Sequence, residues 1–145
     1  MKHLVYTVCA VTFLAWGCGD DNPADSTQDS RTIVAASITV ASGAYREYVF
    51  NVSEDLQNVS VRGAFSVTSG SDTIEVAILS EANYTNWLDG NQVSVLYGSG
   101  QIQSDEFTGL AISDPGDYHL VFSNVTGTAQ KTVNASFELR YTPEE

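Results

Sequence analysis

The most regular feature of the chain is an alternation of apolar and polar side chains with a period of two. It begins near residue 32 and is typical of β-strands that are buried on one face. The last such segment alternates without a break, since Val133, Ala135, Phe137, Leu139 and Tyr141 share one face. The pattern predicts eight strands, over residues 32–40, 45–52, 58–68, 73–80, 92–97, 106–113, 117–125 and 132–141.

Short runs rich in Gly, Asn, Asp and Ser separate these strands, and such residues favour tight turns. The runs lie at residues 42–43, 69–72, 89–91, 98–100, 114–117 and 126–127. Gly63 interrupts its strand and predicts a bulge or bend. Eight short strands separated by turns predict an all-β fold, an antiparallel two-sheet, jelly-roll-like sandwich.

One segment breaks the alternation. In residues 80–90 the side chains of Tyr84, Trp87 and Leu88 follow the i, i+3, i+4 spacing of a helix, which Ser80 can cap and Gly90 can end. We therefore expect a helix of two turns across an open end or edge of the sandwich, where it would cover a strand edge. For Trp87 we expect packing, with a role as a binding aromatic as the alternative.

The N-terminus has the pattern of an export signal. A short basic start, Met1 to His3, precedes an uncharged and mostly apolar run over residues 4–16. A membrane-spanning helix needs about 20 apolar residues, so this run is typical of a signal peptide instead. The next residues, Ala15-Trp16-Gly17-Cys18, resemble a bacterial lipobox, in which a small residue precedes the Cys that becomes lipid-modified. The resemblance implies a covalent diacylglycerol and N-acyl lipid on Cys18.

Cysteine usage bears on the same question. The chain has 2 Cys, and Cys9 lies within the predicted signal peptide. Cys18 would then be the single thiol of the exported chain, without an internal disulfide partner. Lipid modification explains a lone Cys at this position. Ordinary secretion is the alternative, because Ala15-x-Gly17 also fits a small-x-small cleavage site.

A polar, acidic segment follows Cys18. Residues 19–30 contain four Asp and no large apolar side chain, a composition that predicts a flexible tether. We expect four parts in the chain: a lipoprotein signal peptide over residues 1–17, the lipidated Cys and a disordered acidic tether over 18–31, the sandwich over 32–142, and a C-terminal tail over 143–145.

Charge narrows the range of partners. The chain carries 18 acidic and 6 basic residues, a net charge of -12. Nucleic-acid binding needs a basic face, so no nucleic-acid partner is expected, and a polybasic contact with anionic lipid is disfavoured. The membrane partner is expected through the lipid anchor alone.

The sequence offers little catalytic chemistry. After removal of the signal peptide His119 is the only His, and it is out of phase with Tyr118 and Leu120, so we expect it to face solvent or the other sheet face. One His cannot build a zinc site, and no nucleophile motif is evident. We therefore predict no catalytic residue. A small hydrolase would need a pocket that joins His119 to a Ser and a carboxylate.

Calcium is the metal that carboxylates in turns would suit. Asp114 and Asp117 flank a tight turn, Asp105 and Glu106 are adjacent in sequence, and Asp72 and Asp89 lie in other turns. Calcium takes six to eight oxygen ligands, which loops gathered at one end of a sandwich can supply. Asp is also a favoured turn residue in its own right, so we predict no metal site, with Asp114 and Asp117 as the calcium candidates.

The chain also contains Asn-x-Ser/Thr triplets, the glycosylation signal of eukaryotic secreted proteins. They begin at Asn51, Asn58, Asn83, Asn124 and Asn134. In a bacterial chain rich in Ser and Thr such triplets carry little weight.

Two stretches resemble a known group of folds. The first is Glu75-Val76-Ala77-Ile78-Leu79 leading to Asn83-Tyr84-x-x-Trp87-x-x-Gly90, and the second runs from Pro115-Gly116-Asp117-Tyr118 to Asn124. Together they resemble the jelly-roll-like β-sandwich modules of prokaryotic surface proteins, related in pattern to GOLD/emp24-like and pre-peptidase C-terminal domains. The resemblance covers roughly residues 45–142 and implies an accessory role in protein or glycan interaction, with no catalytic residue to carry over.

From these observations we expect a non-enzymatic lipoprotein, exported to the cell membrane or outer membrane and facing the periplasm or the cell surface. Its β-sandwich would bind or brace an envelope protein or a glycan. The alternatives are a calcium- or glycan-dependent adhesion module and a freely secreted accessory domain.

Overall fold

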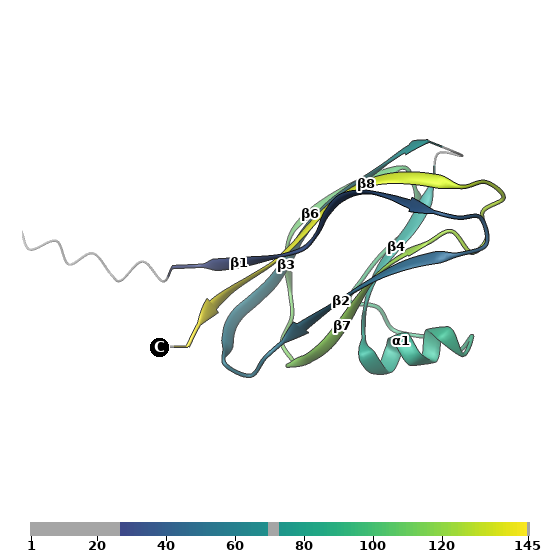
Figure 1. Cartoon of the computed structure of the whole chain (residues 1–145). Helices are drawn as coiled ribbons and strands as arrows, with labels where there is room; N and C mark the ends of the chain where they lie inside the picture. The colour runs from purple at the N-terminus through teal and green to yellow at the C-terminus, as the bar shows by residue number, and fades with distance from the viewer. Residues whose placement is uncertain (1–26, 70–72, 145) are drawn as a thin grey trace, which may run out of the picture.

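Eight strands form two four-stranded antiparallel sheets, which confirms the predicted sandwich (Figure 1). The computed structural model describes residues 27–69 and 73–144. The predicted signal peptide, Cys18 and the tether up to residue 26 lie outside the described residues, as does Asp72. No helix among the described residues is long and apolar enough to cross a membrane.

The strands and the helix follow one another along the chain. They are β1 (Asp29–Val40), β2 (Tyr45–Val52), β3 (Leu56–Ser69), β4 (Ile74–Ser80), α1 (Glu81–Leu88), β5 (Tyr97–Ile102), β6 (Ser104–Ala111), β7 (Gly116–Ser123) and β8 (Lys131–Pro143).

Strand order identifies the sandwich as a jelly roll. One sheet, called sheet A here, has the order β1-β8-β3-β6, and the other, sheet B, has the order β2-β7-β4-β5. Consecutive strands mostly cross from one sheet to the other, so the core between the sheets is built from residues distant in sequence. The inward side chains include the fully buried Phe122 of sheet B and Phe137 of sheet A, whose rings meet edge to face with centroids 5.7 Å apart.

Gly63 has the role that its place in the strand predicts. The register of β3 against β6 shifts between Val61 and Gly63, which confirms a bulge. A Cβ atom at position 63 would lie 2.3 Å from the Phe137 ring, so the ring occupies the space that a side chain would need.

The chain around β5 differs from the prediction. Residues 92–97 were expected to form a strand and residues 98–100 a turn, but the strand begins at Tyr97 and includes Gly98, Ser99 and Gly100. The Ser99 hydroxyl accepts the Val76 backbone N–H at 2.8 Å, where the register against β4 is irregular. Tertiary contact thus overrides the local turn signal. The residues between Leu88 and Tyr97 connect α1 to β5, and Val93 among them packs against the cluster that includes Tyr84 of the helix.

The ends of the sandwich also extend past the expected bounds. β1 begins at Asp29, so the last residues of the segment assigned to the tether pair with β8. At the other terminus Pro143 ends β8, and the Glu144 backbone N–H donates to the Asp55 carbonyl at 3.0 Å.

The predicted helix is confirmed, but its location is not. Ser80 caps α1, with its hydroxyl accepting from the Asn83 backbone N–H, and Gly90 follows the helix with a positive φ of 75°. The helix lies on the outer face of sheet B, over the central strands β4 and β7, instead of at an edge or open end (Figure 1). The reason is that Leu79 and Val121 point outward from those strands and need cover.

Candidate functional site

His119 lies on the outer face of sheet B, buried beneath α1 with only 4% of its surface exposed. The sequence predicted that His119 faces either solvent or the sheet face opposite to Tyr118 and Leu120. The second prediction is confirmed, and the first is wrong. The alternation in β7 sends Tyr118, Leu120 and Phe122 into the core and His119 to the opposite side, where the helix covers it.

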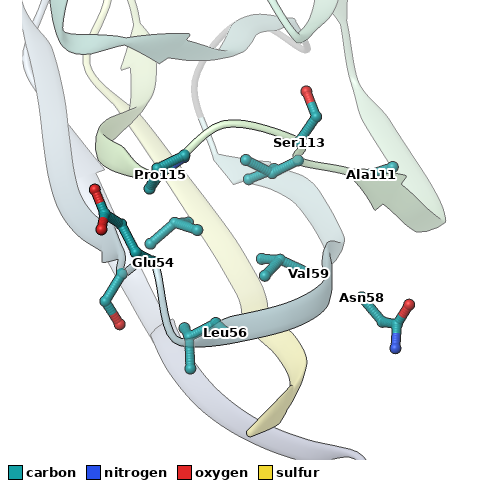
Figure 2. Close-up of a pocket in the computed structure, with 10 residues that line it drawn as sticks. Glu54, Leu56, Asn58, Val59, Ala111, Ser113 and Pro115 are labelled. Carbon is teal, nitrogen blue, oxygen red and sulfur yellow. The ribbon is translucent and has the colours of Figure 1, made fainter. Parts of the chain in front are cut away.

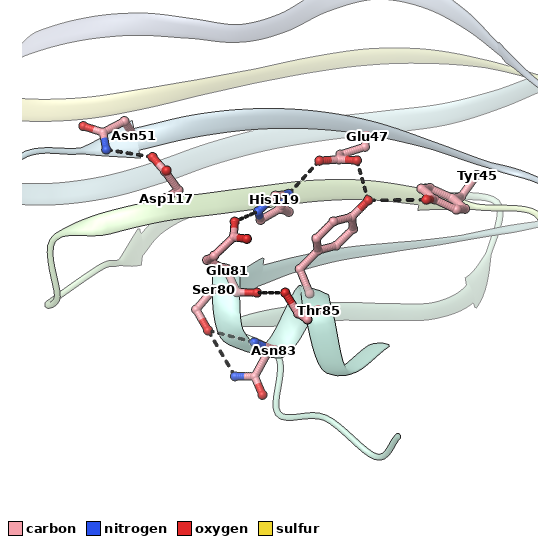
Figure 3. A network of polar contacts seen from close by, with 10 residues as sticks. Tyr45, Glu47, Asn51, Ser80, Glu81, Asn83, Thr85, Asp117 and His119 are labelled. Carbon is pink, nitrogen blue, oxygen red and sulfur yellow. Dashed lines mark hydrogen bonds and ion pairs between the residues drawn. The ribbon is translucent and has the colours of Figure 1, made fainter. Parts of the chain in front are cut away.

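Two carboxylates hold the His119 ring from opposite sides (Figure 3). Nδ1 lies 2.7 Å from Oε1 of Glu47 on β2, and Nε2 lies 2.5 Å from Oε2 of Glu81 in the first turn of α1. Each ring nitrogen therefore lies at hydrogen-bond distance from a carboxylate oxygen. The ring is thus held by two acidic side chains that come from different elements, β2 and α1.

Tyr84 completes this arrangement. Its ring stacks on His119 with centroids 3.9 Å apart and planes 6° from parallel. Its hydroxyl donates to Oε2 of Glu47 and lies 3.4 Å from the Tyr45 hydroxyl. Burial raises the pKa of Tyr84 far above its ordinary value, and the hydrogen bond to Glu47 adds to the shift. We refer to Glu47, Glu81, Tyr84 and His119 as the histidine cluster.

The histidine cluster holds three elements of the fold together. It joins β2, β7 and α1 through hydrogen bonds and ring stacking. Within the described residues both ring nitrogens of His119 are engaged by carboxylates, and no Ser hydroxyl is hydrogen-bonded to the ring. A hydrolytic relay needs a nucleophile in contact with its base, so this geometry gives the hydrolase alternative no support.

A groove adjoins the histidine cluster at the C-terminal end of α1. We call it the aromatic groove; it has a volume of about 380 Å³ and is lined by Tyr45, Glu75, Trp87, Leu88, Ser123, Val125 and Thr126. In the sheet register Ser123 lies opposite Tyr45 on one side and Glu75 on the other. The three therefore form a row across β2, β7 and β4, with α1 on one side and the segment after β7 on the other.

Apolar exposure concentrates at this groove. The described residues include five exposed large apolar side chains, and three of them, Tyr45, Leu88 and Val125, line it. Trp87 packs edge to face on Tyr45 at 5.0 Å and stacks on Tyr84 at 6.0 Å. The expected packing role of Trp87 is thus present, and the same indole lines the groove. Clustered exposed apolar surface marks interaction sites.

A second cavity lies at the opposite end of the sandwich (Figure 2). Its volume is about 480 Å³, and it opens between the β2–β3 connection and the β6–β7 connection. Its walls mix polar and apolar side chains, with Glu54, Asn58 and Ser113 among the polar ones and Leu56, Val59 and Pro115 among the apolar ones. This end cavity is on the side of the molecule where β1 begins and β8 ends.

The calcium candidates make protein contacts. Oδ1 of Asp117 accepts a hydrogen bond from the Asn51 side chain at 2.8 Å, and the Asp114 carbonyl accepts from the Tyr118 hydroxyl at 2.7 Å. Burial raises the pKa of Tyr118, and the nearby Asp114 charge adds to this. Across residues 27–69 and 73–144, no three His, Cys, Asp or Glu side chains are grouped in a way that could hold a metal ion.

Asn124 is a structural residue that the sequence motif does not reveal. It is 1% exposed, and its side-chain Nδ2 donates to the carbonyls of Val40, Ala41 and Ala129. It ties the β1–β2 turn to the β7–β8 connection, so this Asn-x-Thr triplet is closed to modification in the folded protein. Asn51, Asn58 and Asn134 are exposed.

Sequence reasoning singled out His119 and Trp87 but missed their partners Glu47, Glu81 and Tyr45. One signal was available: Val121 and Leu79 are apolar on the outward phase of their strands, which indicates cover on that face. Which polar side chains gather beneath that cover depends on strand register, which the sequence does not display. A scan against models of known protein families finds no match, and a search of curated proteins finds none.

Proposed function

We propose that this protein is an exported envelope lipoprotein without catalytic activity, held to a membrane by acyl chains on Cys18, which binds a ligand in the aromatic groove. The observation that carries the proposal is that the chain enters the sandwich at one end and the groove lies at the other. The chain enters it at Asp29, at the start of β1, whereas the groove is built from the other end, where β2 starts and β7 finishes.

The length of β1 gives this separation a scale. A strand rises about 3.3 Å per residue, so the 12 residues of β1 span roughly 36 Å. In Figure 1 the start of β1 and the C-terminus lie on one side, and the β1–β2 turn lies on the other. A body anchored through Cys18 would present the aromatic groove away from the anchored end, where a partner in the envelope can reach it.

Charge is consistent with this arrangement. The protein carries a net charge of -12, so its body is repelled by an anionic membrane surface and stands off from it on the acidic segment after Cys18. The lack of catalysis is supported by His119, whose two nitrogens are both occupied by carboxylates. The likeness to GOLD/emp24-like and pre-peptidase C-terminal domains remains a proposal about the fold, since these are also sandwich modules.

The anchor is tested by lipid labelling. The full chain is expressed in a bacterial host that processes lipoproteins, fed radiolabelled palmitate, and compared with Cys18→Ser and with Cys9→Ser as the matched control. We expect label in the parent chain and in Cys9→Ser, and none in Cys18→Ser. Mass spectrometry should find an acylated Cys18 at the mature N-terminus.

Two outcomes would contradict the anchor. An unlabelled parent chain, or a mature N-terminus without acylation, would replace it with free secretion. Label that survives Cys18→Ser would place the lipid elsewhere. Neither outcome bears on the groove, because ligand binding by the sandwich is measured separately.

A further inference from the structure

We infer that the aromatic groove binds one uncharged pyranose ring of a glycan. This inference rests on the proposed function, because it names the ligand of the groove assigned there. A pyranose has an apolar face of C–H groups and a rim of hydroxyls, so its site needs an apolar aromatic wall next to hydrogen-bonding groups on a floor.

The floor of the groove supplies the hydrogen-bonding groups. Ser123 is 9% exposed, and within the described residues its hydroxyl makes no hydrogen bond. It points outward because its β7 neighbour Phe122 points into the core. Glu75 lies beside it in the register, and Gln101 lies beside Glu75 on β5, so the row continues with a carboxylate and an amide.

The walls supply the apolar faces. Tyr45 and Trp87 stand edge to face, and Leu88 and Val125 flank them, each about half exposed. The rings are held in place from behind, since Trp87 stacks on Tyr84 and Tyr84 belongs to the histidine cluster. A wall fixed in this way loses little conformational freedom when a ligand binds.

Polarity of the floor favours a sugar over an apolar peptide side chain. An apolar side chain placed over Ser123 and Glu75 would take both away from water without offering a hydrogen bond, which is costly. Hydroxyls of a sugar can donate to the carboxylate and exchange hydrogen bonds with the serine. A volume of about 380 Å³ is at the lower end of small-ligand sites, which suits one ring of a longer chain.

Charge decides between neutral and acidic sugars. The residues that line the groove include the carboxylate of Glu75 and no Lys or Arg. A uronic or sialic acid would place its carboxylate next to Glu75 without a compensating cation. The ligand is therefore an uncharged sugar, and acidic sugars are excluded by repulsion.

The test uses the full chain in micelles of a zwitterionic detergent that has no sugar headgroup. Binding of neutral tetrasaccharides of glucose, galactose, mannose and N-acetylglucosamine is measured by calorimetry, with tetragalacturonate as the anionic comparator and N-acetylphenylalaninamide as the apolar one. A Trp16→Phe background leaves Trp87 as the only indole whether or not the signal peptide is cleaved, so its fluorescence reports on the groove.

We expect at least one neutral tetrasaccharide to bind saturably and to change Trp87 fluorescence, and tetragalacturonate not to bind. Glu75→Gln should weaken binding about 10- to 100-fold, as for a lost hydrogen bond to a charged group, and Ser123→Ala about 2- to 10-fold. Glu106→Gln, an exposed carboxylate on the outer face of sheet A, is the matched control and should leave binding unchanged. Melting temperatures verify that each variant is folded.

Several results would overturn the inference. These are no binding of any neutral sugar to the folded protein, equal or tighter binding of tetragalacturonate, and binding that both floor substitutions leave unchanged. Binding of N-acetylphenylalaninamide in place of sugars would assign the groove to a protein partner. Each is distinct from a failed anchor, which shows as missing lipid on Cys18 while sugar binding persists.

Discussion

The outer faces of the two sheets differ in what covers them. Sheet A presents exposed polar side chains such as Arg62, Asn134 and Ser136 directly to solvent. In sheet B, α1 covers the central strands β4 and β7 and hides the apolar Leu79 and Val121 together with His119. Both sheets have the same antiparallel geometry, so the difference comes from the residues on the outward phase of the central strands.

The comparison explains where chemistry can collect. In sheet A apolar and polar side chains alternate along the strands, so one face of the sheet is buried and the other is exposed to solvent. The side chains of the exposed face contact mostly water. When the outward phase is also apolar, a covering element is needed, and polar groups at its margin become partly enclosed. For this reason His119 is enclosed beneath α1, and the aromatic groove lies at the margin of the helix.

The largest effect on stability is expected where α1 covers the apolar side chains of sheet B. Leu79 is 1% exposed beneath α1, so Leu79→Ala should lower the free energy of unfolding by about 2–5 kcal/mol, through lost burial and a cavity. Asn134→Ala, on the bare face of sheet A, should change it by less than about 0.5 kcal/mol. Urea titration followed by circular dichroism measures both, and equal losses would refute the distinction between the faces.

Removal of the His119 side chain from the histidine cluster should have the next largest effect on the free energy of unfolding. His119→Ala takes away the partner of Glu47 and Glu81 and the surface on which Tyr84 stacks, at an expected cost of about 1–3 kcal/mol. Hydrogen exchange should rise in α1 more than in sheet A. Uniform acceleration over the whole chain would mean that the cluster does not hold the helix in particular.

Alkaline pH should weaken the sheet B side first. The folded pKa of Tyr84 is raised above the ordinary value of 10.0, so its contribution to stability is complete below about pH 10 and is lost as the pH rises further, because the unfolded chain releases the proton first. Burial and hydrogen bonding to Asp105 raise the pKa of Tyr97 as well. Above pH 10 the unfolding midpoint should fall less steeply with pH in Tyr84→Phe than in the parent chain. Unfolding is followed through the absorbance of tyrosinate. An unchanged slope would contradict this.

The exposed ion pair of sheet A is expected to contribute less than Leu79 or His119 of sheet B. Arg62 and Glu138 form an ion pair of 3.3 Å with 53% and 30% of their side-chain surfaces exposed, and exposed pairs contribute little. Arg62→Ala should lower the free energy of unfolding by less than about 1 kcal/mol and should do so less at high salt. A loss comparable to that of His119→Ala would show that the bare face is also stabilised by its charges.

Local patterns anticipated most of the fold. Alternation placed the strands within a few residues, and the Ser80 cap with Gly90 set the limits of α1, because these signals depend on neighbours along the chain. They failed at β5, where Gly98, Ser99 and Gly100 have the composition of a turn but belong to a strand that pairs with β4. Pairing with a distant strand outweighed the local preference there.

The sequence by itself determined the periodicity of the strands, the helix and its caps, and the acidic charge, since each is a property of residue types and their spacing. Only the tertiary structure decided that α1 lies over β4 and β7, that Glu47 and Glu81 enclose His119, and that Tyr45, Ser123 and Glu75 form one row. The physical reason is register. Which side chains meet across a jelly roll depends on strands far apart in the chain, and a shift of one residue would turn every one of them to the opposite face.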